Sequence, residues 1–228
     1  MSWHLFLSYT CKSRFCSSCG YKYKLVRVEN ILETAYRVQH RQLVFTIPQE
    51  LRKYFFFPFE ERTDLLFQAV KETIYSILND VYRSNKKTSK KKKYCKNRNI
   101  KFTPGFFSFL HTFGRDIKWN PHIHVLIAEM KIGSDDSIKK WDYFNFDDLS
   151  KRFQKILIDL LTELGPNVFS NWERQKAFYK HKNGFYVYAE KNKFDNLKDG
   201  IEYITRYCGR APISKNRIIN YDGNNVTF

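Results

Sequence analysis

Two histidines separated by one residue begin an apolar run in the stretch NPHIHVLIAEM, residues 120–130. Because side chains alternate across a β-strand, His122 and His124 project to one face, while Ile123 and Val125 project to the other. Two imidazoles on one face suit the binding of a single metal ion. Histidines also occur as ordinary polar residues of half-buried strands, so this spacing needs support from the rest of the chain.

The neighbouring strand offers a third ligand for such an ion. The strand-like run GFFSFLHTF, residues 105–113, is joined to the histidine strand by the polar stretch 114–121. An antiparallel hairpin folded about this connection places His111 opposite His122. Asp116, inside the connection, is a competing candidate that would supply a harder oxygen ligand, and the residues alone leave both open.

Two tyrosines four residues apart, Tyr203 and Tyr207, lie in the stretch GIEYITRYCGR. This segment reads as a helix over about residues 196–208, so both hydroxyls lie on one side of it. A tyrosine oxygen can attack a phosphodiester when a cation withdraws charge from the phosphate. Arg206 and Arg210 could hold flanking phosphates through bidentate hydrogen bonds. With 15 tyrosines in the chain, an aromatic pair used only for packing is the alternative.

Three cysteines, Cys11, Cys16 and Cys19, crowd into a basic stretch near the N-terminus. The odd total of 5 cysteines favours a reducing compartment and metal ligation over a disulfide framework. Tetrahedral zinc needs a fourth ligand, for which His4 is a candidate. A structural zinc site is one interpretation, and a half-site without metal is the other.

The charge balance favours a polyanionic partner. Lys and Arg number 40 against 23 Asp and Glu, a formal net charge of +17, so nucleic acid is the first candidate and an anionic membrane the second. A lysine-dense stretch over residues 86–101 is expected to be an exposed loop that contacts DNA phosphates without sequence preference. Its central residues are Lys90, Lys91, Lys92 and Lys93.

Membrane insertion is not expected. No stretch approaches the roughly 18 apolar residues that a membrane span needs, and the N-terminus lacks a signal-peptide pattern. We therefore expect a soluble, cytoplasmic protein with no membrane partner.

The expected elements combine into an α+β fold, an antiparallel sheet with helices packed on one face. Helices are expected at 24–39, 59–85, 146–165 and 196–208, and strands at 41–48, 105–113, 122–130 and 185–191. Gly165 is the expected C-terminal cap of its helix.

Trp119, just before the histidines, could stack a base or pack into the hairpin core, and we favour the core. We expect the chain to divide into a partial zinc-binding segment at 1–24, which resembles a zinc knuckle, and a catalytic domain at 25–228.

These elements together resemble the HUH endonuclease superfamily, and specifically the two-tyrosine rolling-circle transposases of the insertion sequence 91 type. CKSRFCSSCGYKY is similar to the end of that family's zinc-binding region, and LHTFGRDIKWNPHIHVLI to its histidine motif. YITRYCGRAPISKNRIINYDGNNVTF is similar to its tyrosine motif and the segment that follows. The resemblance implies that His122 and His124 bind the metal and that Tyr203 and Tyr207 are nucleophiles. His111 falls where the family carries a polar residue. Compared with the family pattern, the chain looks shortened at both ends.

The resemblance implies a DNA transposase that cleaves and joins single-stranded DNA at the ends of a mobile element. A divalent ion, Mg²⁺ or Mn²⁺, would assist a tyrosine that forms a 5′-phosphotyrosine link and releases a 3′-hydroxyl. A rival interpretation is a non-catalytic, zinc-stabilised nucleic-acid-binding remnant of such a transposase. A third is a metal-dependent hydrolase that uses a histidine-bound water and leaves a free 5′-phosphate.

Overall fold

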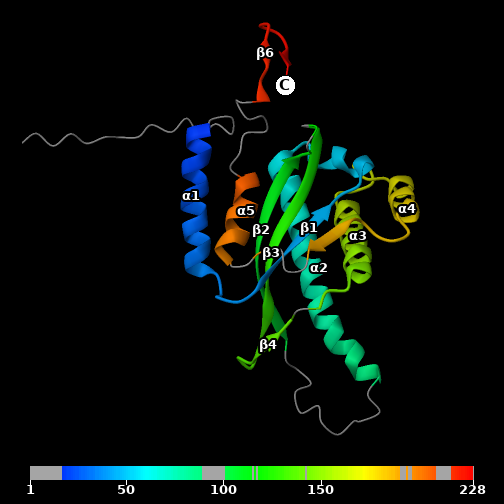
Figure 1. Cartoon of the computed structure of the whole chain (residues 1–228). Coiled ribbons are helices and arrows are strands. Elements are labelled where there is room, and N and C mark those ends of the chain that lie inside the picture. Colours follow the sequence, from blue (N-terminus) through cyan, green and yellow to red (C-terminus); the bar gives the residue numbers. More distant parts are fainter. Residues whose placement is uncertain are drawn as a thin grey trace, which may run out of the picture.

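One antiparallel sheet lies between two helical layers (Figure 1). The computed structural model describes residues 17–88, 101–114, 116, 118–141, 143–190, 194, 197–208 and 217–227. Within them, the elements follow in the order α1 (Ser17–Thr34), β1 (His40–Thr46), the 3₁₀ helix η1 (Gln49–Phe55), α2 (Phe59–Thr88), β2 (Phe102–Phe113), β3 (Trp119–Gly133), β4 (Ile138–Lys140), α3 (Phe146–Glu163), α4 (Asn171–Lys180), β5 (Val187–Glu190), α5 (Leu197–Cys208), β6 (Asn220–Tyr221) and β7 (Val226–Thr227).

The sheet has the strand order β2-β3-β1-β5, with β4 added to β3. All of these pairs are antiparallel, which confirms the predicted α+β class. β3 is central because it pairs with β1 on one side and with β2 on the other. β6 and β7 form a separate two-stranded hairpin.

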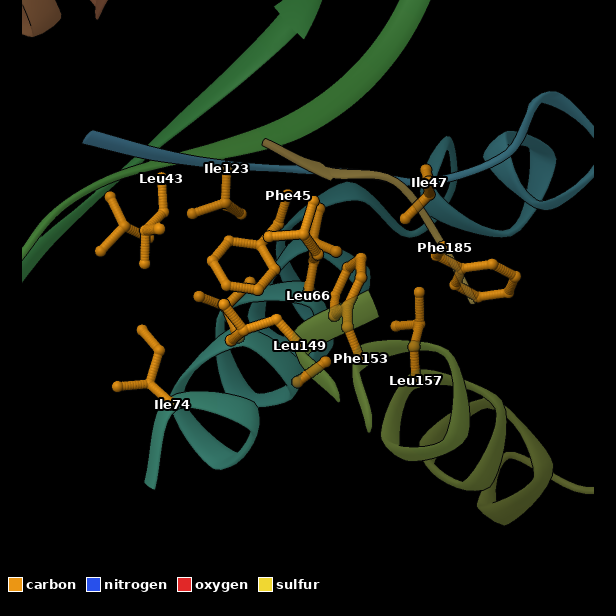
Figure 2. Packing of buried hydrophobic residues seen from close by; sticks show 14 of the residues in the cluster. Leu43, Phe45, Ile47, Leu66, Ile74, Ile123, Leu149, Phe153, Leu157 and Phe185 are labelled. Carbon is orange, nitrogen blue, oxygen red and sulfur yellow. The ribbon is translucent and has the colours of Figure 1, made fainter. Parts of the chain in front are cut away.

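The main core lies between one face of the sheet and helices α2 and α3. Alternate residues of β1 and β3, including Phe45 and Ile123, point into this core because strand side chains alternate faces. Figure 2 shows them against Leu66 of α2 and Phe153 of α3. The rings of Phe45 and Phe153 pack edge to face with centroids 5.1 Å apart. Each such buried side chain stabilises the fold by about 1.5–3 kcal/mol.

The opposite face of the sheet carries a second, smaller core made with α5 and α1. Ile201 and Ile204 of α5 are buried in it together with Phe109 of β2 and Leu126 of β3. Gly200 of α5 leaves room for the ring of Phe194, because a Cβ at this position would lie 3.1 Å from it. Helices therefore cover both faces, and not the single face that the sequence predicted, because α1 and α5 carry apolar side chains that pack on β2 and β3.

Capping residues set the limits of the helices on the main core. Asn145 caps α3, its side chain accepting a hydrogen bond from the backbone N–H of Asp148 at 3.2 Å. Gly165 follows the end of α3 with a φ of 95°, which confirms its predicted role as a cap. α4, which the sequence analysis did not predict, begins with a capping box between Ser170 and Glu173.

Two further differences concern element boundaries. α2 continues to Thr88, three residues beyond the expected end at 85. α1 runs without a break across the predicted boundary between residues 24 and 25. The division into a zinc-binding segment and a catalytic domain stays a prediction.

Among the described helices, none combines the length and apolar character needed to cross a membrane.

Candidate metal centre

Three histidines from two adjacent strands converge on the α5 side of the sheet. His111 of β2 pairs directly with His122 of β3, which is the register predicted from the hairpin. His124 pairs with Phe109, a member of the smaller core, so the histidines share its face of the sheet. One ring nitrogen from each histidine lies within 4.8 Å of the other two.

Hydrogen bonding orients the ring of His122. Its Nδ1 lies 2.6 Å from the carbonyl oxygen of Asn120. A carbonyl oxygen can only accept, so Nδ1 carries the proton and Nε2 has the lone pair needed by a metal. That Nε2 lies 3.1 Å from Nδ1 of His111. Metal–nitrogen bonds of about 2.1 Å at angles of 90–110° separate ligand nitrogens by roughly 3.0–3.4 Å, so the two rings fit a common ion.

Gln42 of β1 supports the third histidine and was missed by the sequence analysis. Its side-chain amide lies 2.9 Å from Nδ1 of His124, and the residue is only 5% exposed. The atom that faces Nδ1 is the amide nitrogen of Gln42, which donates; ligation of a metal through Nε2 of His124 requires the proton on Nδ1, and so a Gln42 amide turned by 180° so that its oxygen accepts. The alternation of Gln42 with the apolar Leu43 is the signal that could have revealed it, since a polar residue on a covered face needs a partner.

The electrostatic surroundings of His111 and His122 favour neutral imidazoles. Burial, followed by the charge on His122, lowers the pKa of His111 to about 4. Burial is also the main cause that lowers the pKa of His122; the nearby Arg52 charge adds to it and the hydrogen bond to Asn120 opposes it. Neutral imidazole is the form that binds metals. A set of three nitrogens is softer than Mg²⁺ prefers, so this donor set suits Mn²⁺ better.

Helix α5, which carries the predicted tyrosine pair, lies over the same face of the sheet as the histidines. Tyr203 is half-buried and packs against the smaller core, with its ring centroid 5.4 Å from that of Phe194. The structure describes Arg206 and Tyr207 as part of the α5 backbone but does not describe their side chains. Arg210 lies outside the described residues.

Asp116, the competing third ligand, does not join the histidines. Its carboxylate accepts a hydrogen bond from the backbone N–H of Lys118 at 3.3 Å and lies 3.5 Å from that residue's Nζ. Among the residues that the structure describes, the metal-ligating cluster consists of His111, His122 and His124. This geometry favours His111 as the third ligand.

Other predicted site residues fall largely outside the described part of the chain. Cys19 is half-buried in α1. The residues outside are Cys11, Cys16, Lys90, Lys91, Lys92 and Lys93.

A half-open cavity of about 310 Å³ lies away from the histidines. It is lined by residues that include Arg37, His40 and Gly200. His40 and Thr46, the partner of His122, are six positions apart on β1, or about 20 Å at the usual rise of a strand. The candidate metal centre thus lies on the sheet, apart from this cavity.

Comparison with known families agrees with the motifs. Residues 105–228, more than half of the chain, match the family described as "Putative transposase". Residues 4–47 match the "Transposase zinc-binding domain" of the insertion sequence 91 type. These matches, with the α+β fold, define the class of protein as a member of a transposase family. The chain belongs to the transposase family of the insertion sequence 91 type. The zinc-domain match supports Zn²⁺ as a metal of its N-terminal region.

Two relatives align over nearly the whole chain. The transposase for insertion sequence element IS801 of Pseudomonas savastanoi pv. phaseolicola is 27% identical over 95% of this chain and 50% of its own length. "Putative transposase y4qJ" of Sinorhizobium fredii (strain NBRC 101917 / NGR234) is 22% identical over 96% of this chain and 55% of its own length. The chain thus spans about half the length of these relatives. No solved structure gives a significant match.

Proposed function

We propose that this transposase cleaves and rejoins single-stranded DNA through a 5′-phosphotyrosine intermediate. The observation that carries the proposal is the common face of the sheet shared by the histidine cluster and by α5, the helix of Tyr203 and Tyr207. A nucleophile and an electrophilic centre must meet at one phosphate, and elements on opposite faces could not do so.

His111, His122 and His124 would hold the divalent ion through the ring nitrogens that face one another. When bound, the ion would withdraw charge from the non-bridging oxygens of the scissile phosphate. The hydrogen bonds from His122 to the Asn120 carbonyl and between His124 and Gln42 keep two of the rings in a ligating orientation. Burial favours the neutral forms of His111 and His122, the forms that can bind a cation.

One tyrosine hydroxyl would form a bond to the 5′ phosphorus while the bond from phosphorus to the 3′ oxygen breaks. The departing oxygen takes a proton and leaves as a 3′-hydroxyl, so the energy of the phosphodiester is kept in the phosphotyrosine. The second tyrosine permits a second cleavage before the first link is resolved. Strand transfer follows when a 3′-hydroxyl attacks the phosphotyrosine, and no net hydrolysis occurs.

The basic residues supply contacts along the DNA strand. Arg206, between the two tyrosines, and Arg210, just after them, would bind neighbouring phosphates. Lys90, Lys91, Lys92 and Lys93 would add affinity without sequence preference. The high net charge of +17 supports this assignment.

The test is incubation of the full chain with 5′- and 3′-labelled single-stranded oligonucleotides carrying the ends of its element. Products are resolved on a denaturing protein gel with Mn²⁺ or with EDTA. We expect a labelled adduct that needs the metal and disappears in the Tyr203→Phe, Tyr207→Phe double variant. Tyr188→Phe, an exposed tyrosine of β5, is the matched control and should retain the adduct.

Cleavage that persists in the double variant and leaves a free 5′-phosphate would replace this proposal with a metal-dependent hydrolase. Salt-sensitive binding without any adduct would instead identify a DNA-binding remnant.

A further inference from the structure

The segment from Arg52 to Phe57 lies against the start of β3, close to the histidine cluster. The indole N–H of Trp119 donates to the carbonyl oxygen of Arg52 at 3.0 Å, and Nη1 of Arg52 donates to the carbonyl oxygen of Trp119 at 3.4 Å. Trp119 is three residues before His122 on the same strand. The Arg52 charge also contributes to lowering the pKa of His122, as expected for close neighbours.

Arg52 has hydrogen-bonding capacity that the described protein does not use. Its Nε is buried and has no hydrogen-bond partner among the described residues. Burial of an unpaired guanidinium N–H is costly, so the Arg52 side chain would gain by turning outward and donating this N–H to a phosphate oxygen. None of the ion pairs found in the described part of the chain includes Arg52.

Two phenylalanines beside Arg52 are exposed to solvent. Phe56 is 65% exposed and Phe57 is 83% exposed. The ring of Phe56 meets that of Trp119 edge to face with centroids 5.4 Å apart, so it is anchored on one side only. Trp119 itself is half-buried and packs against the main core, as predicted.

We propose that Arg52, Phe56 and Phe57 form a binding site for single-stranded DNA at the start of β3, the strand that carries His122 and His124. Arg52 binds a phosphate oxygen, while the exposed phenyl rings stack on bases. Unpaired bases are required because the faces of paired bases are covered by their neighbours in a duplex. The unpaired guanidinium donor, the exposed rings and the net charge of +17 together point to single-stranded DNA as the ligand. This inference rests on the DNA-processing role proposed above.

The proposal is tested by fluorescence anisotropy with the full chain in EDTA, where no cleavage can occur. One probe is a labelled oligothymidylate, and the other is an abasic strand of the same length and charge. We expect Phe56→Ala and Phe57→Ala each to weaken oligothymidylate binding by roughly tenfold and to leave abasic-strand binding unchanged. Arg52→Gln should weaken binding of both strands and make the salt dependence shallower by about 0.7 in the log–log slope.

Matched controls are two exposed residues of α4, the helix that Glu173 links to Lys53 and Tyr54 of η1. Trp172 is 67% exposed and Arg174 is exposed, so Trp172→Ala and Arg174→Gln remove the same types of group. Both should bind the two strands as the unchanged protein does. Because Phe57 makes little contact with the core, circular dichroism should show that Phe57→Ala folds normally.

Unchanged oligothymidylate binding in folded Phe56→Ala and Phe57→Ala would overturn the proposal. Equal losses on both strands would also overturn it, because they would exclude stacking. A change in self-association without a change in DNA binding would make this surface a contact between copies of the chain. Since neither metal nor cleavage is involved, failure of tyrosine chemistry in the adduct assay is a separate result.

Discussion

Gln42 is the residue that most directly positions the ring of a candidate metal ligand. It is a buried amide on β1, and its side chain meets Nδ1 of His124 at 2.9 Å. A buried amide in an apolar strand normally costs stability unless it is hydrogen-bonded. Here the hydrogen bond also fixes the ring orientation of a candidate ligand.

Replacement of Gln42 by Leu should lower Mn²⁺ affinity by about 10- to 100-fold, because His124 loses the partner that holds its ring. Titration of the purified chain with Mn²⁺, followed by electron paramagnetic resonance, measures the effect. Gln68→Leu, which removes an exposed amide on α2, is the control and should bind Mn²⁺ normally. Unchanged affinity in Gln42→Leu, alongside a loss in His111→Ala, would show that Gln42 does not orient the site.

At the scale of elements, one carboxylate joins η1 to the first turn of α4. Glu173 accepts hydrogen bonds from Lys53 at 2.8 Å and from the hydroxyl of Tyr54, and it completes the capping box with Ser170. The hydrogen bond from Lys53, then those from Tyr54 and Ser170, lower the pKa of Glu173 to about 2. η1 also carries Arg52, so this link helps to position the segment next to the histidines.

This link should make the stability of the protein sensitive to acid. A carboxyl group whose pKa falls on folding stabilises the folded state above its unfolded value of 4.5, and that stabilisation is lost as the pH falls toward 2. Denaturant unfolding at several pH values should therefore show Glu173→Gln less stable than the unchanged protein at pH 7. The difference should shrink below pH 4.5. Glu72→Gln, an exposed carboxylate on α2, provides the comparison, and a gap that persists at low pH would contradict the assignment.

For the whole molecule, the excess of positive charge determines how affinity for DNA depends on salt. Counterion release makes the logarithm of the binding constant fall linearly with the logarithm of salt concentration, by about 0.7 for each phosphate contacted on a single strand. With a net charge of +17, long-range attraction should also speed association at low salt.

Replacement of Lys90, Lys91, Lys92 and Lys93 by Gln should reduce the slope by up to about 3, because up to four phosphate contacts are lost. The measurement is single-strand binding across a series of salt concentrations. A charge-matched control replaces four exposed lysines of α2, α3 and α4, namely Lys71, Lys151, Lys155 and Lys176. Equal reductions in both variants would mean that only the net charge matters and that the loop makes no contacts of its own.

Local patterns in the sequence were sufficient to predict the strand that carries His122 and His124. They also predicted the strand register that places His111 opposite His122. Strand alternation and a hairpin between neighbouring segments involve residues close in the chain, so their geometry can be inferred without the rest of the fold. The same holds for Gly165, whose role as a cap depends only on the helix before it.

The tertiary structure alone decided which distant residues join the histidines. Gln42 and Arg52 meet their partners across 82 and 67 positions of sequence, through pairing of β1 with β3 and packing of η1 on the start of β3. Likewise, α5 lies on the histidine face because its apolar side packs on Phe109 and Leu126. The sequence determined the chemistry available on each segment, whereas long-range packing, which local propensity does not encode, determined which segments meet.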